Sequence, residues 1–130
     1  MFSIHNEVKM KIKLKPLDEL FSRIIRNRAI ANVGGCERCW AWKADYKQLQ
    51  CAHMFTRKYH SVRWDEDNAV GVCAGCHFFL DSHPQEKIDF FKQRLGEEKF
   101  DLLQARANTK GIDKELIKLY LQNRIKEREK

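Results

Sequence analysis

The chain has 130 residues and a mass of 15.5 kDa, a size that suits one compact domain and excludes a multidomain enzyme. Its 25 lysine and arginine residues against 18 acidic ones give a formal charge of +7, which favours a polyanionic partner over an acidic substrate. The apolar runs are far shorter than the roughly 18 residues of a membrane-spanning helix, and no signal-peptide pattern follows Met1. We therefore expect a cytoplasmic protein with no membrane partner.

The N-terminal region is basic, because residues 1–28 hold seven basic and three acidic residues. Four apolar residues in 8–14 alternate with lysines, which indicates either a strand with one cationic edge or a disordered basic arm. From Pro16 onward, apolar residues at helical spacing predict an amphipathic helix that Gly34-Gly35 ends. Its polar side either faces solvent or contacts phosphate, through Arg23, Arg26 and Arg28.

Two Cys-x-x-Cys motifs are separated by 33 residues, and their cysteines are Cys36, Cys39, Cys73 and Cys76. Each motif presents two thiolates from one tight turn, and two such turns complete the tetrahedral site of a structural Zn²⁺ ion. A redox pair is disfavoured, because there are two copies and neither lies in a βαβ pattern. The sequence therefore predicts one structural zinc bound by these four thiolates.

Three residues near these motifs have simpler interpretations. A closed four-cysteine site leaves no coordination position for Cys51, which we expect to be a small buried hydrophobe. Trp40 and Trp42 are expected to cover the core, with stacking on an unpaired base as the alternative.

The remaining elements follow from apolar periodicity. Residues 47–56 predict a strand on which Cys51 and His53 share one face and Ala52 the other. After Pro84, three apolar stripes separated by glycines predict three helices. The stripes are Ile88, Phe91 and Leu95; Phe100, Leu103 and Ala107; and Leu116, Leu119 and Tyr120.

Three polar residues carry a family resemblance. His53, Asn68 and His77, with the last two arranged as Asn-x4-Cys-x-x-Cys-His, resemble the His-Asn-His (HNH) endonucleases, also called ββα-metal or treble-clef nucleases. More narrowly, Cys51-Ala52-His53, the basic loop that follows it and the run 63–68 resemble the lambdoid phage NinG (Rap) recombination nucleases. The resemblance, from about Leu17 to Ala107, implies a DNA endonuclease of phage or prophage recombination, in a bacterial or phage-infected cell, with branched DNA as one substrate class.

Phosphodiester hydrolysis needs a general base, a cation at the phosphate and positive groups that hold the strand. A neutral histidine suits the first task, and His53 is the candidate base. Asn68 is expected to tie down the loop or to orient His53, and His77 to bind a catalytic Mg²⁺ or Mn²⁺ ion. The alternative makes His53 a metal ligand and His60 the base. The predicted nucleic-acid contacts are Arg57, Lys58 and Arg63.

The second ligand of the catalytic metal is open. In many HNH enzymes the residue before the base binds the metal, and that position holds Ala52 here. On a helix that continues from His77, Asp81 at i+4 shares its face, whereas His83 at i+6 is turned about 120° away. Asp81 is therefore the preferred second ligand, with His83 as the other candidate. The acidic run 65–67 is expected to supply turn and capping groups, with Asp65 as a minor candidate ligand.

The sequence thus predicts a single α+β domain with a zinc-stapled treble-clef ββα-metal core at 36–83. A basic arm and helix precede this core at 1–35, and C-terminal helices follow it at 84–130. The predicted function is a metal-dependent DNA endonuclease, and a homodimer is one option for its assembly. The alternatives are a non-catalytic zinc-dependent nucleic-acid-binding module and an adaptor that binds protein through its C-terminal helices. A pure binder has no reason to assemble His53, Asn68 and His77, which favours the nuclease.

Overall fold

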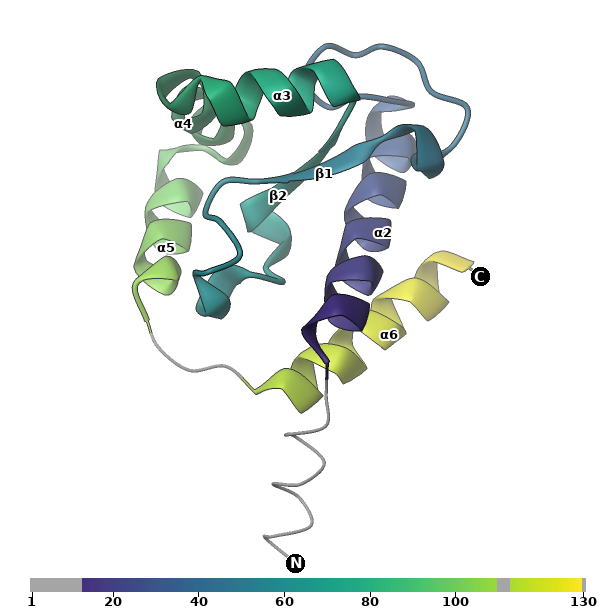
Figure 1. Ribbon diagram of the computed structural model, residues 1–130, viewed down its shortest axis with the longest axis vertical. Coiled ribbons are helices and arrows are strands. Elements are labelled where there is room, and N and C mark those ends of the chain that lie inside the picture. Colours follow the sequence, from purple (N-terminus) through teal and green to yellow (C-terminus); the bar gives the residue numbers. More distant parts are fainter. Residues whose placement is uncertain (1–12, 110–112, 130) are drawn as a thin grey trace, which may run out of the picture.

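The computed structural model describes residues 13–109 and 113–129, in which five α-helices surround a two-stranded antiparallel sheet (Figure 1). This is the predicted small α+β fold. The predicted N-terminal strand or arm at 1–12 lies outside the described residues. None of the helices in this part of the chain combines the length and the apolar character that crossing a bilayer requires.

Helix α2 (Leu14–Val33) confirms the predicted amphipathic helix and begins two residues before Pro16. Gly34 ends it with a left-handed backbone, φ 71°, and donates its N–H to the Ile30 carbonyl at 3.0 Å. A side chain on Gly35 would lie 2.0 Å from the Ala41 carbonyl oxygen, so only glycine allows the chain to fold back here. Gly34 therefore ends helix α2, and Gly35 allows the first cysteine turn to begin directly after it.

Strand β1 (Gln50–His53) pairs with β2 (Ala69–Val72), with Gln50 opposite Val72 and His53 opposite Ala69. The predicted strand at 47–56 is too long at both ends. At its start, the Asp45 carboxylate accepts the Lys47 N–H at 2.7 Å and caps a 3-10 turn, η1 (Tyr46–Gln48). At its end, the backbone N–H and carbonyl of Phe55 bond to the side-chain amide of Asn68 instead of a strand partner.

The two faces of the hairpin pack against different helices. Cys51 and Ala69 lie in the cluster formed by α2, whereas Ala52, Val70 and Val72 lie in the cluster on the other face. A Cβ atom at Gly71 would lie 2.8 Å from the Cβ of Ala29, so α2 crosses β2 at that glycine. His53, opposite Ala69, therefore belongs to the α2 face of the sheet.

Helices α3 (Ala74–Ser82), α4 (Pro84–Leu95) and α5 (Glu97–Ala107) cover the other face and the loop of the hairpin (Figure 1). Phe91 and the stripe Phe100, Leu103 and Ala107 are buried, while Ile88 and Leu95 pack partly buried against the core. The first two predicted apolar stripes are thus confirmed.

Helix α6 (Lys114–Glu129) packs against α2, but the predicted third stripe is wrong. Leu116 and Leu119 are 63% and 53% exposed, and Tyr120 is exposed as well. The face toward α2 consists of Ile117, Leu121 and Ile125. Apolar residues occur on both sides of this helix, so their spacing alone does not select the buried side.

This packing predicts different costs for two leucines of the same helix. Leu121→Ala should lower the free energy of unfolding by about 2–5 kcal/mol, because Leu121 is fully buried. The matched control Leu116→Ala should change it by no more than about 0.5 kcal/mol. Urea unfolding followed by circular dichroism measures both, and equal losses would show that α6 buries its other face.

Candidate metal centre and histidine site

The four predicted zinc ligands converge. The Sγ atoms of Cys36, Cys39, Cys73 and Cys76 all lie within 4.8 Å of one another, with 3.8 Å between those of Cys39 and Cys73. One pair comes from the turn after α2 and the other from the start of α3. This four-cysteine group could hold a metal ion such as zinc, and it joins two elements that are far apart in the chain.

Hydrogen bonds to its sulfur favour the thiolate form of Cys36, whereas burial raises the pKa of Cys76 to about 12. The Sγ of Cys36 accepts the N–H groups of Arg38 and Cys39, both at 3.4 Å. Burial alone would raise the pKa of Cys36, but backbone N–H groups, Cys39 first, outweigh it and lower the pKa to about 7. The Arg38 guanidinium lies 3.4 Å from the Sγ of Cys76. The donor set therefore fits a structural zinc ion.

Cys51 lies outside this group and packs with the α2 cluster, which confirms its predicted role as a small apolar residue. Burial raises the pKa of its thiol to about 12, so it remains protonated.

Gly75, inside the second cysteine turn, has ordinary backbone geometry and open space around its Cα. Neither positive φ nor close approach of another group therefore requires glycine there.

The two tryptophans contradict the prediction that they cover the core. Trp40 is 66% exposed and Trp42 is 77% exposed. Both belong to the turn 35–42, which closes on itself through a bridge between Gly35 and Trp42 and a bond from the Cys36 N–H to the Ala41 carbonyl. These backbone contacts close the turn at the surface, and both aromatic side chains remain largely exposed to solvent.

Glu37, which sequence reasoning missed, fastens the first cysteine turn to the sheet. Its N–H donates to the Gly71 carbonyl at 2.9 Å, and its carboxylate accepts the Gly71 N–H at 2.6 Å. Arg94 of α4 donates to the same carboxylate at 3.0 Å. The sequence feature that could have identified Glu37 is the presence of an acidic residue inside a Cys-x-x-Cys turn.

His53 ends β1 and lies half-buried on the α2 face, where its ring centroid is 5.7 Å from that of Phe21. Burial lowers the pKa of His53 to about 4, and the positive charge of Arg57 adds to this effect. A backbone hydrogen bond with Arg63 and the charge of Asp18 act in the opposite direction. The imidazole is therefore neutral near neutral pH, as a proton acceptor must be.

Asn68 is buried and immediately precedes β2. Its amide oxygen accepts the Phe55 N–H at 2.8 Å, and its amide nitrogen donates to the carbonyls of Phe55 and Val62 at 2.9 and 3.0 Å. The Asn68 backbone carbonyl also accepts the Met54 N–H at 2.9 Å. Asn68 thus ties the loop to the residues directly after His53, one of the two arrangements expected.

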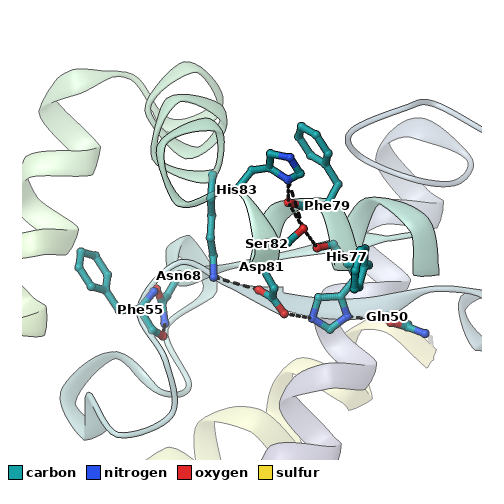
Figure 2. Close-up of polar contacts among 10 residues, drawn as sticks. Gln50, Phe55, Asn68, His77, Phe79, Asp81, Ser82 and His83 are labelled. Atoms are coloured by element: carbon teal, nitrogen blue, oxygen red, sulfur yellow. Dashed lines mark hydrogen bonds and ion pairs between the residues drawn. The ribbon is translucent and has the colours of Figure 1, made fainter.

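His77 and Asp81 lie on the same side of α3, with 3.2 Å between Nε2 and Oδ2 (Figure 2). The Nδ1 atom of His77 is 2.7 Å from the Oε1 atom of Gln50, so each ring nitrogen lies beside an oxygen atom, and Nδ1 can donate to Gln50 in the tautomer whose Nε2 is unprotonated. Lys87 of α4 donates to the other Asp81 oxygen at 3.1 Å. Gln50, which sequence reasoning did not single out, therefore orients His77.

His83 is not brought to His77. Its ring stacks on Phe79 with centroids 4.1 Å apart, and its Nδ1 lies 2.9 Å from the Phe79 carbonyl, on the opposite side of α3 (Figure 2). This agrees with the preference for Asp81, and it removes His83 from the candidate ligands. His60 is exposed at the start of η2 (His60–Val62), in the hairpin loop.

The acidic run 65–67 caps and ties the loop, as predicted. Asp65 accepts the Asp67 N–H at 3.0 Å at the start of η3 (Glu66–Asn68) and binds Arg106 at 2.7 Å. Glu66 binds Arg124 at 2.9 Å and accepts the hydroxyl of Tyr120. These carboxylates join the hairpin loop to α5 and α6.

The basic residues divide into structural and accessible ones. Arg63 binds Asp18 through two nitrogens, at 3.0 and 2.6 Å, and Arg28 donates to the carbonyls of Glu66 and Ala69 at 2.8 and 2.6 Å. Arg57 is 63% exposed at its side chain, and Lys58 is exposed beside it. Of the three predicted nucleic-acid contacts, Arg57 and Lys58 therefore face solvent, whereas Arg63 holds the loop to α2.

The histidine residues form two neighbouring sets. His53 faces α2, while His77 and Asp81 lie on α3 across the hairpin. Lys87 pairs with Asp81, and its charge is the smallest of the contributions to the lowered pKa of His53. In residues 13–109 and 113–129, the four cysteines are the only group of three or more ligand-type side chains close enough to share a metal.

Comparisons with protein-family models, with curated proteins and with solved structures find no match to this chain. Function is therefore inferred from the residues and their geometry.

The cysteine geometry predicts that Cys36→Ser removes zinc and unfolds the protein, because metal binding and folding are coupled. The control Cys51→Ala should keep one zinc per chain, since Cys51 lies outside the group. Metal analysis of purified protein with circular dichroism tests both. Folded wild-type protein without zinc, or loss of zinc in Cys51→Ala, would contradict the assignment.

The lowered pKa of His53 predicts a pH dependence of stability. The unfolded chain binds a proton below about pH 6.5, whereas the folded protein binds it only near pH 4, so acid favours unfolding between these values. The free energy of unfolding should fall more for the wild type than for His53→Gln between about pH 7 and about pH 5. Equal falls, measured by urea unfolding, would show that His53 titrates normally in the folded state.

Proposed function

We propose that this protein is a metal-dependent DNA endonuclease of the HNH, treble-clef type. The observation that carries the proposal is the pairing of His77 with Asp81, 3.2 Å apart on the helix that follows a hairpin whose first strand ends in His53. The Oε1 atom of Gln50 lies 2.7 Å from Nδ1 of His77 and can accept its N–H, so that Nε2 could serve as the metal ligand. Phage or prophage recombination and branched DNA belong to the same proposal through the family resemblance.

The chain's own part in hydrolysis begins with His53. A neutral imidazole takes a proton from the attacking water while the new bond to phosphorus forms and the bond to the leaving oxygen breaks. The leaving oxygen then takes a proton from solvent. Burial is the largest cause of the low pKa of His53, and the nearby Arg57 is the next. A DNA phosphate bound to Arg57 brings negative charge to this position, which raises the pKa of His53 and makes it a stronger base in the complex.

A divalent cation fits the second part of the site. His77 and Asp81 supply one imidazole nitrogen and one carboxylate oxygen, and Mg²⁺ or Mn²⁺ commonly takes its other ligands from water and a substrate phosphate. Such an ion would neutralise charge that develops on the phosphate. Ala52 is fully buried against the core, so the strand offers no further ligand at that position. Arg57 and Lys58, both exposed, are proposed to hold the DNA backbone.

The second candidate is a zinc-dependent nucleic-acid-binding module without catalysis. It is favoured by the four cysteines being the only group of three ligands in the described part of the chain. Exposed Arg57 and Lys58 would account for DNA binding in either case. The two candidates differ in whether DNA is cut when Mg²⁺ or Mn²⁺ is added.

The test is cleavage of plasmid and branched DNA by purified protein with and without Mg²⁺ or Mn²⁺. His53→Ala should lower the cleavage rate by about 10²- to 10⁴-fold while zinc content and DNA affinity stay unchanged. His77→Ala should also abolish cleavage, with partial rescue by excess Mn²⁺. Asn68→Ala should lose stability as well as rate, because its amide bonds hold the loop.

His83→Ala is the matched control, since His83 lies on the other side of α3, and it should cut at the wild-type rate. A His53→Ala protein that cuts normally while His60→Ala does not would move the base to His60. No cleavage of any DNA with either metal, in protein that binds DNA, would favour the binding module.

A further inference from the structure

A hollow of about 530 Å³ lies beside the first cysteine turn, between the end of α2 and helix α4. It is separate from His53 and from the pair His77 and Asp81, none of which lines it. Its lining combines two aromatic rings, two amides and two guanidinium groups: Trp40, Phe90, Asn32, Gln93, Arg38 and Arg94. A site of this composition offers flat apolar faces, hydrogen-bond donors and acceptors, and positive charge together.

Trp40 has an unusual backbone for its residue type. Its φ is 65°, in the left-handed region, and it is the only non-glycine residue with positive φ in the described part of the chain. A bulky side chain is strained there, and glycine would adopt this conformation without cost. The Trp40 ring gains little from burial in return, because it is 66% exposed. Folding therefore does not explain a tryptophan at this position, and such strain is often found where a side chain serves binding.

We infer that this hollow binds an unpaired base of single-stranded DNA, with the base stacked on Trp40. The inference rests on the proposed function for the choice of DNA, and it adds a substrate class that the catalytic residues do not specify. Every base has a flat aromatic face, so stacking on tryptophan needs no particular sequence. Asn32 and Gln93 are exposed amides that can donate to and accept from a base edge.

Charge favours a nucleotide over an apolar peptide in this hollow. Arg38 and Arg94 line it, and the chain as a whole carries a formal charge of +7. Glu37 also lines the hollow, but its carboxylate is already bound by Arg94 at 3.0 Å and by the Gly71 N–H at 2.6 Å. Two guanidinium groups against one carboxylate leave the lining with an excess of positive charge, which favours a phosphate next to the stacked base over an apolar peptide.

The test compares Trp40→Gly with Trp42→Ala, a neighbouring exposed tryptophan that does not line the hollow. Binding of oligothymidylate and of a duplex of equal length is measured at one fixed salt concentration. Trp40→Gly should weaken oligothymidylate binding by about 5- to 150-fold, the range for loss of one stacked base, and leave duplex binding within about twofold. Trp42→Ala should leave both affinities unchanged.

Two further readouts separate binding from structure. Trp40→Gly should unfold at the same temperature as the wild type or higher, because glycine relieves the strained backbone. Oligothymidylate should quench the fluorescence of the wild type and of Trp42→Ala, but not of Trp40→Gly, in which Trp64 is buried and Trp42 lies outside the hollow.

Unchanged oligothymidylate affinity in Trp40→Gly, or an equal loss in Trp42→Ala, would overturn the inference. A fall in melting temperature with no change in affinity would also overturn it, since it would give Trp40 a structural role. Plasmid cleavage by Trp40→Gly is measured in parallel, so that failure of this inference and failure of the proposed function can be distinguished. A wild type that binds oligothymidylate through Trp40 and cuts no DNA would refute the nuclease and keep the base site.

Discussion

Four cysteine sulfur atoms within 4.8 Å of one another are the constraint on which the core depends. Four thiolates repel one another at this separation, and a bound cation would remove that repulsion. Its two halves come from the end of α2 and the start of α3, which enclose the hairpin between them. A bound ion therefore fixes the distance between two helices that a core of this small size would hold only loosely.

The position of the catalytic candidates follows from that constraint through Glu37. Because Glu37 lies between the first two cysteines and makes two bonds to Gly71, the metal turn and β2 move as one unit. Strand β2 in turn sets the register of β1, which ends in His53, and it begins directly after Asn68. Helix α3 starts at the second cysteine pair and carries His77 one turn later. If these cysteines bind zinc, its loss should therefore displace the candidate residues, although none of them belongs to the four-cysteine group.

Local signals in the sequence predicted the parts of the fold that depend on spacing. A fixed spacing within one segment is enough to predict four features. These are the cysteine pairs, the glycine end of α2, the shared face of His77 and Asp81, and the stripes of α4 and α5. The strand was predicted too long because Asp45 and Asn68 divert its ends, and these contacts involve residues outside the strand. The buried side of α6 depends on which of its sides packs against α2. The exposure of the two tryptophans depends on how the turn 35–42 closes. Both are decided by contacts between segments, which the residue spacing within one segment does not reveal.

Asp18 explains why only some basic residues remain accessible for the proposed DNA contact. Its carboxylate accepts from Arg63 and from the Trp64 indole, which locks the loop against α2, and Arg57 is 4.0 Å away. Burial works to raise the pKa of Asp18, but these donors and charges outweigh it and lower the pKa. The more exposed Arg57 has the looser contact, so a phosphate can draw it from Asp18 without disturbing Arg63. The same exchange would change the charge beside His53, so in the proposed nuclease DNA binding and the strength of the base would be coupled through one arginine.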